Sequence, residues 1–419
     1  MSLDMVRVYN KEILRLRPCG NAPQGLRSGL RSGLMLKKGA FPKIRTFSDN
    51  QTMNKSEEDP MYLQKVNKLD FTDQCIYVGL DVHKKNWKVA IYHDYGFYKS
   101  FSQDPDPKIL MQYLRRTFPG GQYHVVYESG CFGFWIAHQL QALGVHCIVT
   151  HPADVPTTDK QKRRKTDRVD ANKLAQELRA GKLTPLYVPA ISAISDRMLV
   201  RTRAKMVKNQ TRLKNQIKSL LTFMGIPVPF DSKQHWSRQF MHWLQTLDLP
   251  QATATASLKA YLVLLEDTRN QLADLTRQVR QLARQPTYQP LVELLMSIPG
   301  VGPITSMVLI VELIDMHRFK NLDKLCGYVG LVPDIESTGQ TTHVKGLTKR
   351  ANTYVKHMII EASWVAIAKD PALMSDYSKL IMRMKKQHAI IRMARKLLAR
   401  VRFVWMHEKP YQHSYQPVS

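Results

Sequence analysis

The chain has 419 residues, of which 44% are apolar, so it is large enough for two or three domains with buried cores and is not globally disordered. Sixty-two Lys and Arg against 34 Asp and Glu give a formal net charge of +28, which makes a polyanion the expected partner. No apolar stretch approaches the ~20 residues of a membrane span, and five scattered cysteines without a CxxC spacing favour buried thiols in a reducing compartment.

The first part of the chain, residues 1–73, differs in composition from the rest. It contains the echo Leu-Arg-Ser-Gly-Leu-Arg-Ser-Gly-Leu at 26–34 and a polar stretch at 48–59, without a sustained period of 2 or 3.6. We expect a flexible leader, or a non-native start upstream of Met53 or Met61.

An α/β layer is predicted for residues 74–185. Alternating apolar residues predict strands at 75–82, 87–93, 97–101, 122–128 and 145–150, and helical spacing predicts helices at 108–118, 132–143 and 166–180. Three strands in hairpin succession, followed by alternating helices and strands, are typical of the ribonuclease-H-like order. The fold class is therefore α/β plus α, with a ribonuclease-H-like first domain.

The remainder of the chain is predicted to be helical. Two long amphipathic helices at 195–224 and 256–282 suggest an antiparallel coiled-coil arm spanning 193–287, which either dimerises or packs on its own domain. Residues 290–408 are expected to form a mostly helical domain that ends in one basic helix at 376–406, with a tail at 409–419.

Four carboxylates stand out in this basic chain. Asp81 and Glu128 end the first and fourth predicted strands, and Asp167 and Asp170 share one side of the helix at 166–180. Clustered carboxylates repel one another, and Mg²⁺ or Mn²⁺ removes the conflict because both prefer oxygen ligands. Each acid alone reads as an ordinary cap or turn residue. Their order predicts a metal site at which two ions assist phosphodiester chemistry.

Basic residues flank these acids. Lys84 follows Asp81 closely, and the run Lys162, Arg163, Arg164 and Lys165 leads directly into the acidic pair. A nucleic-acid strand could be drawn past the metals by this flank. The alternative is a solvated, charged helix face.

Gly300 and Gly302 lie between two helical patterns. Glycine permits a tight turn there, and the following helix N-terminus leaves amides free to hold a phosphate. The segment is similar to a helix-hairpin-helix element, which grips nucleic-acid backbone. A plain helix–helix turn remains the alternative.

Several motifs in order resemble one known family. The segments at 78–84, 127–130 and 165–171 look like the signature of DEDD transposases, the insertion-sequence recombinases related to Piv-type DNA invertases. Further matching segments lie at 298–302, 327–333, 337–339, 346–352 and 394–398. The resemblance covers residues from about 75 to about 405.

This resemblance implies an unusual active site. It implies a RuvC-like nuclease domain, a coiled-coil segment and a C-terminal domain whose serine attacks DNA to form a covalent 5′-phosphoserine, assisted by metal-bearing carboxylates of another subunit. It also implies donor and target DNA and a structured bridge RNA as partners, a homo-oligomer from dimer to tetramer, and a cytoplasmic, nucleoid-associated protein without a membrane partner.

The serine motif departs from the family pattern. The family's serine commonly precedes the glycine directly, but here that position is Thr338 and the serine is Ser337. We expect Ser337 to be the nucleophile and Thr338 to be second, because a threonine hydroxyl is more hindered. Basic residues that could neutralise phosphate follow in the loop and in the last helix: Lys345, Lys349, Arg350, Arg395 and Lys396.

The sequence thus predicts a site-specific DNA recombinase of the transposase type. One alternative is a junction-resolving nuclease, in which metal-activated water cuts DNA and the serine has no role. Another is a non-catalytic nucleic-acid-binding protein derived from a decayed element. A protein–DNA adduct that survives denaturation separates the recombinase from the nuclease, because hydrolysis leaves none. The non-catalytic protein would keep its full function after the acids are removed.

Overall fold

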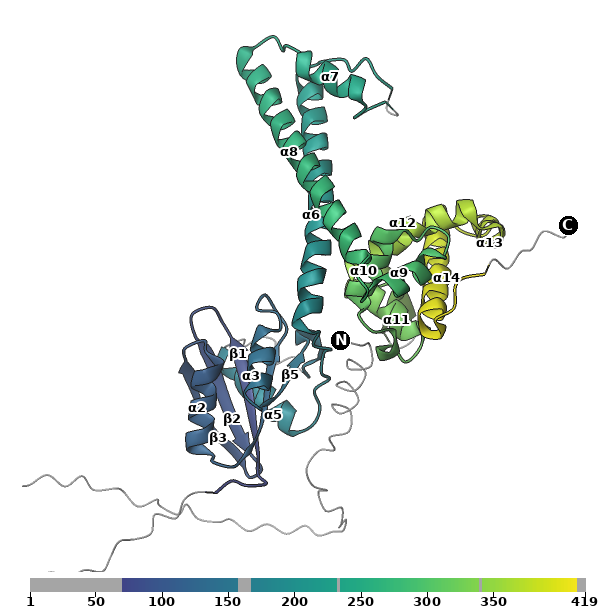
Figure 1. Cartoon of the computed structure of the whole chain (residues 1–419). Helices are drawn as coiled ribbons and strands as arrows, with labels where there is room; N and C mark the ends of the chain where they lie inside the picture. The colour runs from purple at the N-terminus through teal and green to yellow at the C-terminus, as the bar shows by residue number, and fades with distance from the viewer. Residues whose placement is uncertain (1–69, 157–166, 232–233, 339–340, 413–419) are drawn as a thin grey trace, which may run out of the picture. The chain divides into compact units, whose positions relative to one another are not determined.

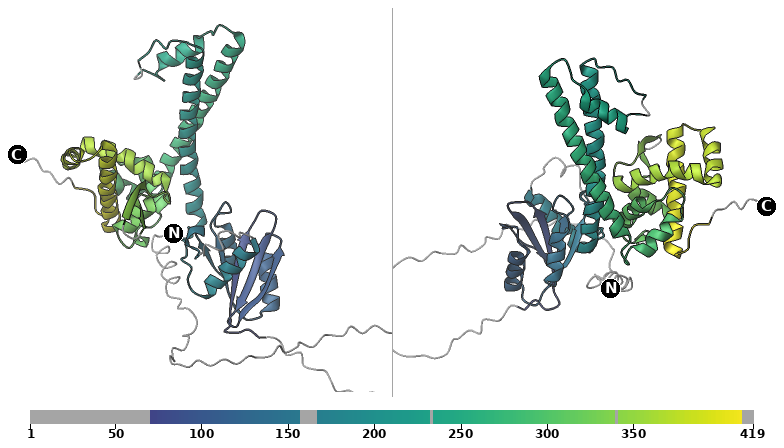
Figure 2. Two further views of the ribbon diagram at one scale, coloured as in Figure 1. Left: turned by 180° about the vertical axis from the view of Figure 1, so that it is seen from behind. Right: turned by 45° about the horizontal axis from the view of Figure 1, so that its top comes forward.

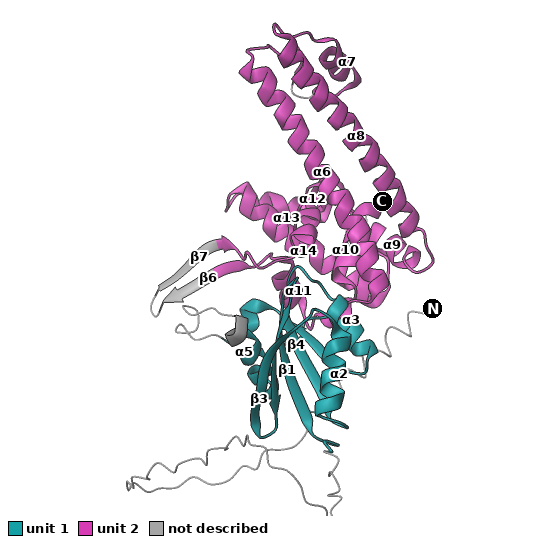
Figure 3. Cartoon of the chain, turned by 90° about the vertical axis from the view of Figure 1, so that its left-hand side faces the viewer, with its two compact units in different colours: residues 1–188 teal, residues 189–419 magenta. Residues whose placement is uncertain are grey.

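The computed structural model describes residues 70–156, 167–231, 234–338 and 341–412, without the side chains of 167–169 and 335–345. The chain divides into two compact units, residues 1–188 and 189–419, which are coloured separately in Figure 3. Within the described ranges, no helix is both long and apolar enough to cross a membrane.

The first unit is built on a five-stranded mixed sheet (Figure 1). Its strands are β1 (Cys75–Val82), β2 (Trp87–His93), β3 (Gly96–Gln103), β4 (Gln122–Glu128) and β5 (His146–Thr150), in the spatial order β3-β2-β1-β4-β5. The strands β1, β2 and β3 pair antiparallel, and β1, β4 and β5 pair parallel. All five predicted strands are confirmed, and this order is compatible with a ribonuclease-H-like fold.

Helices cover both faces of this sheet. The helices α2 (Pro107–Thr117) and α3 (Trp135–Ala142) bury Leu110, Leu114 and Ile136 against Val78 and Leu80 of β1. The helix α5 (Asp167–Arg179) packs on the opposite face, over β1, β2 and β4. A short 3₁₀ helix, η1 (Pro152–Asp154), follows β5. The alternation of apolar side chains along the strands therefore supports two helical layers.

The second unit contains a pair of long antiparallel helices, α6 (Ile191–Phe223) and α8 (Ala252–Ala283). The Arg203 guanidinium of α6 donates to Thr276 Oγ1 of α8 at 3.1 Å. Ile217 and Leu258 share a hydrophobic core nearer the end of the pair at which α6 ends and α8 begins. Figure 2 shows the pair from two sides, with α7 (Arg238–Thr246) at that end. The helix α7 was not predicted, because the segment between the two long helices reads as an irregular loop. The two long helices were predicted.

The other helices of this unit share one hydrophobic core with α10 (Pro303–Leu313), whose residues 305–313 are all buried. They are α9 (Gln289–Met296), η2 (Met316–Arg318), α11 (Leu322–Val329), α12 (Thr353–Lys369), α13 (Pro371–Ile381) and α14 (Lys386–His407), with a hairpin of β6 (Pro333–Thr338) and β7 (Thr341–Leu347). Val200 of α6 and Val279 of α8 belong to the same core. The boundary expected near residue 288 therefore falls within one packed unit.

The single basic helix predicted at 376–406 is wrong. The chain turns between α13 and α14, where the amides of Arg383 and Met384 both bond to the Leu380 carbonyl, and Lys385 is extended with φ −60° and ψ 142°. The helix α14 buries residues along its whole length, whereas α13 fully buries only Leu373. Two differently packed helices therefore replace one, at a break that no Gly or Pro signals.

Candidate active site

Asp81 and Glu128 lie at the carboxyl ends of neighbouring parallel strands. The register of β1 and β4 pairs Leu80 with Tyr127, and each acid is the next residue along its strand. Because side chains alternate between the faces of a sheet, both acids point away from the α2 and α3 side, where Leu80 and Tyr127 are buried. The two predicted acids thus share one edge and one face of the sheet.

The shared face is the one that α5 covers. A Cβ atom on Gly79 would overlap the carbonyl oxygen of Ala171 and lie 2.5 Å from the amide nitrogen of Ala175, so the α5 backbone lies directly on β1. Leu174 of the same helix is buried with Val126 of β4. Gly79 and Val126 each precede one of the two acids by two residues, so they share its face. The helix therefore covers β1 and β4 next to the two acids.

The direction of α5 places its N-terminus towards this edge. At the other end of the helix, the Arg179 guanidinium donates to the Asp94 carbonyl oxygen at 2.6 Å. Asp94 lies in the turn after β2, at the edge of the sheet where β1 begins. The first turn of α5 consequently lies towards the edge where β1 ends. Asp170 is partly buried in that turn, and Asp167 is the first helical residue, with its side chain outside the described ones.

These carboxylates supply the oxygen ligands that Mg²⁺ and Mn²⁺ prefer. Among the described side chains, no three His, Cys, Asp or Glu residues are grouped closely enough to hold a metal ion. Asp81 is 20% exposed, and its Oδ1 lies 3.5 Å from Nδ1 of His83. Asp81, Glu128 and Asp170 fit a hard divalent cation by donor type, and Asp167 would add a fourth carboxylate from outside the described side chains.

The predicted basic flank is only partly described. Lys84 is exposed in the turn that follows β1. Residues Lys162, Arg163, Arg164 and Lys165 lie outside the described ones. A phosphate-binding role for all five residues stays a prediction.

The candidate nucleophiles lie in the β6–β7 hairpin, which sequence analysis had expected to be a loop. The backbone register pairs Ser337 with Thr342 and Thr338 with Thr341, next to the hairpin turn. Their side chains, and that of Lys345, lie outside the described ones. In the described backbone, the pairing of the two strands places both residues near the end of the hairpin.

Residues at the base of the hairpin are described. The amide of Thr348 donates to the Val332 carbonyl oxygen at 3.1 Å, which closes the two strands. Lys349 and Arg350 are exposed in the segment that leads from β7 to α12. Both are therefore accessible to a phosphate at the root of the hairpin.

The glycine turn between α9 and α10 has a packing role. Gly300 has φ +84°, and a Cβ there would overlap the Ala362 carbonyl oxygen and lie 2.8 Å from the Ala366 amide nitrogen in α12. Gly302 caps α10, and nothing lies within 4 Å of the position of its Cβ. Close helix packing alone explains glycine at 300, and phosphate binding at 300 and 302 stays a prediction.

Arg395 and Lys396 of α14 make contacts within the protein. Arg395 donates to the Leu331 carbonyl oxygen at 3.3 Å and to Asp323 Oδ1 at 3.1 Å, and Lys396 pairs with Asp376. About a third of the Arg395 side chain and half of the Lys396 side chain remain exposed. Each residue can therefore reach a ligand only by sharing or leaving its acidic partner.

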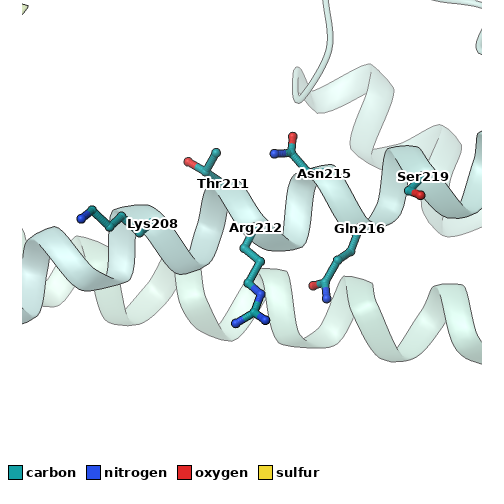
Figure 4. A pocket seen from close by; sticks show the side chains of 6 residues that line it. All are labelled: Lys208, Thr211, Arg212, Asn215, Gln216 and Ser219. Carbon is teal, nitrogen blue, oxygen red and sulfur yellow. The ribbon is translucent and has the colours of Figure 1, made fainter. Parts of the chain in front are cut away.

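A polar face along α6 was not singled out from the sequence. Six side chains line a shallow groove on this helix (Figure 4): Lys208, Thr211, Arg212, Asn215, Gln216 and Ser219. They recur at intervals of three or four residues, which places them on one side of the helix. Two cations among neutral hydrogen-bonding groups suit a sugar-phosphate backbone. The spacing is the signal that could have identified this face.

Two family models match the chain. A transposase model of the DEDD type for IS110 elements matches residues 78–226, and the model described as the transposase IS116/IS110/IS902 family matches residues 292–379. The first match includes the four acids, and the second includes the hairpin.

Individual proteins show the same likeness. The chain is 30% identical to "Putative transposase y4qE" of Sinorhizobium fredii over 57% of each chain. It is 28% identical to "Putative transposase y4rJ" of the same organism, over 77% of this chain and 90% of that one. It is 23% identical to the transposase for insertion sequence element IS1533 of Leptospira borgpetersenii, over 59% and 72%. All three likenesses are to transposases.

Proposed function

Because the chain belongs to the IS110-type family of DEDD insertion-sequence transposases, we propose that it cuts and rejoins DNA as a site-specific recombinase through a covalent serine intermediate. Transposases act on DNA, in agreement with the formal net charge of +28. The observation that carries the proposal is the placement of Asp81 and Glu128 in register, on the face of the sheet that α5 covers.

In this proposal, Asp81, Glu128, Asp167 and Asp170 hold Mg²⁺ or Mn²⁺. The bound metal supplies charge neutralisation at the scissile phosphate. The protein's part is to fix the acids, two on strand ends and two on the first turn of a helix packed tightly on Gly79. Acids on regular elements keep their relative positions better than acids on loops.

The covalent step is assigned to Ser337. Its Oγ attacks the phosphorus of DNA and loses its proton, a P–Oγ bond forms, and the bond from phosphorus to the 3′ oxygen of the neighbouring nucleotide breaks. The departing oxygen takes up a proton and becomes a 3′ hydroxyl. A 3′ hydroxyl of another strand then attacks the phosphoserine and releases the serine. No net hydrolysis occurs, so the cut strand can be rejoined.

Nucleic-acid backbone is proposed to follow basic residues of both units. In the first unit these are Lys84, Lys162, Arg163, Arg164 and Lys165, and in the second Lys345, Lys349, Arg350, Arg395 and Lys396 together with the polar face of α6. The family resemblance supports a structured guide RNA beside donor and target DNA, and an assembly of two to four copies in which one subunit's acids serve another's serine.

Denaturing gels test the covalent step. Purified protein is incubated with Mg²⁺, candidate RNA and labelled DNA bearing the element ends, and the products are denatured. We expect a slowly migrating protein–DNA species with wild type and with Thr338→Ala, and none with Ser337→Ala. A junction-resolving nuclease would instead give cut DNA without any adduct, and a non-catalytic binder would give neither.

A further inference from the structure

The core of the second unit contains a buried charge, which no step of the proposed function uses. Glu312 lies in α10, within the apolar run from Met307 to Leu313, and it is 0% exposed. A buried carboxylate costs several kcal/mol unless it is paired and hydrogen-bonded. Its partners should therefore reveal why an acid occupies this place.

The first partner is the root of the long helix α6. Arg201 grips the carboxylate with two donors, Nε to Oε1 at 2.6 Å and Nη2 to Oε2 at 2.8 Å. One turn earlier, Arg197 Nε donates to the Val311 carbonyl oxygen at 2.8 Å and lies 3.9 Å from Oε2 of Glu312. A bidentate pair fixes orientation as well as distance. Glu312 thus fixes the orientation of α6 on α10.

The second partner is the residue at which the hairpin returns to the helical core. Asn352 follows β7 and caps α12, its Oδ1 accepting from the Val355 amide at 3.2 Å. Its Nδ2 donates to Glu312 Oε2 at 2.8 Å, on the same oxygen that Arg201 Nη2 holds. One carboxylate oxygen therefore joins the long helix to the end of the hairpin segment.

Further contacts connect this point to the base of the hairpin. The backbone amide of Asn352 donates to the Tyr328 carbonyl oxygen at 2.8 Å, and the Tyr328 hydroxyl donates to the Glu312 backbone carbonyl oxygen at 3.2 Å. Gly330 has φ +81°, and a Cβ there would overlap the Cβ of Ala351. The two chain segments at the foot of the hairpin are consequently clamped together beside Glu312.

We propose that Glu312 is a positioning residue that fixes the place of the β6–β7 hairpin relative to α6, because it binds Arg201 on one side and Asn352 on the other. A displacement of the long helix α6 then also displaces the hairpin that bears Ser337. A negative charge is required at position 312, because a neutral side chain could not accept hydrogen bonds from both the Arg201 guanidinium and the Asn352 side-chain amide. This inference rests on the proposed function for its catalytic consequence, but its structural part stands without it.

Two variants and one control test this role in the full-length protein. Asn352→Ser keeps a helix-capping side chain but loses the amide donor to Glu312. Arg201→Lys keeps the charge but loses the two-pronged grip. Arg203→Lys is the matched control, because Arg203 lies on the same helix and bonds Thr276 of α8 rather than Glu312.

The first readout is amide hydrogen exchange at residues 328–332 and 346–352, measured without DNA. We expect about tenfold faster exchange in Asn352→Ser and in Arg201→Lys, and less than about twofold change in Arg203→Lys. Peptides of α14 should exchange as in wild type in all three. Equal exchange at the hairpin base in the variants and the control would overturn the inference.

The second readout separates positioning from simple destabilisation. Recombined DNA under single-turnover conditions should fall about tenfold in both variants, with the DNA dissociation constant within about threefold of wild type. The double variant should lose little more than either single one, because both changes break one linkage. A loss no larger than that of the control would contradict the role. If wild type itself fails to recombine DNA, the proposed function fails, and the exchange measurement still decides the positioning.

Discussion

Asp81 and Glu128 lie at matching positions of two neighbouring parallel strands, because each is one residue beyond the paired residues Leu80 and Tyr127. The parallel pairing of β1 and β4 places strand ends from distant parts of the sequence at one edge. Alternation along each strand turns both side chains to the face of α5. The acidic edge is thus a consequence of register rather than of loop geometry.

Removal of either charge should stop catalysis without stopping binding. We expect Asp81→Asn and Glu128→Gln to lower recombination by about a thousandfold or more, since each removes a proposed metal ligand, while DNA affinity changes by less than about threefold. Asp104→Asn, which alters an exposed acid just after β3, is the control and should behave as wild type. Recombination that survives in both variants would refute the metal site.

A methyl group at Gly79 should displace α5. Overpacking against the helix backbone typically costs about 1–3 kcal/mol, so Gly79→Ala should lower the melting temperature and also weaken catalysis, because α5 bears Asp167 and Asp170. Gly130→Ala serves as control, since nothing lies within 4 Å of that Cβ position. Thermal unfolding and recombination are measured together, and a fully active, equally stable Gly79→Ala protein would show that α5 does not lie on β1 as described.

The polar face of α6 should contribute to the salt dependence of binding. Each phosphate contact contributes about 0.9 to the slope of log K against log salt for duplex DNA. The double variant Lys208→Gln/Arg212→Gln should therefore reduce that slope by about 1.8. Lys259→Gln/Arg277→Gln removes two cations of α8 that already pair with acids, and should leave it nearly unchanged. Equal effects of the two double variants would argue against a specific face.

Acidification should weaken the first unit through a histidine pair. His124 Nδ1 lies 3.3 Å from His146 Nδ1, and the Tyr77 ring stacks on His124. Burial lowers the pKa of His124 below 6.5, and the neighbouring His146 lowers it further. Burial also lowers the pKa of His146. His146 has more exposed surface than His124, so we expect His124 to cause most of the pH dependence of stability.

The sign follows from proton linkage. The unfolded chain takes up protons below about pH 6.5 while the folded pair does not, so stability falls as the pH drops through that range towards the lowered folded pKa values. Urea unfolding between pH 7.5 and 5.5 should show a falling midpoint in wild type. The slope should flatten in His124→Gln/His146→Gln. An unchanged slope would mean that other groups cause the acid sensitivity.

The sequence indicated the elements that repetition of apolar residues defines. Apolar residues alternate along the five strands and recur every three or four residues along the long helices. The type and approximate ends of these elements were therefore predicted. The hairpin of β6 and β7 was not, because its Ser, Thr and Gly residues read as a turn. Nor was α7, or the break near Met382, where tertiary packing rather than a Gly or Pro interrupts the helix.

The candidate residues could be named from the sequence, but their contacts could not. Asp81 and Glu128 were visible as strand-terminal acids, yet only the register shows that they lie level. Glu312 gave one signal, an acid inside an apolar run, but its partners Arg201 and Asn352 are 111 and 40 residues away in the sequence. Contacts of such separation are set by the fold, and local pattern does not reveal them.

The most direct test of the account maps the covalent bond. Wild-type protein reacts with element-end DNA, candidate RNA and Mg²⁺, the DNA is digested by nuclease, and tryptic peptides that span residue 337 are analysed by mass spectrometry. We expect a nucleotide phosphate on Ser337, absent without Mg²⁺ and absent in Asp81→Asn. Cut DNA with free 5′ phosphate ends, together with an unmodified Ser337 peptide, would contradict it.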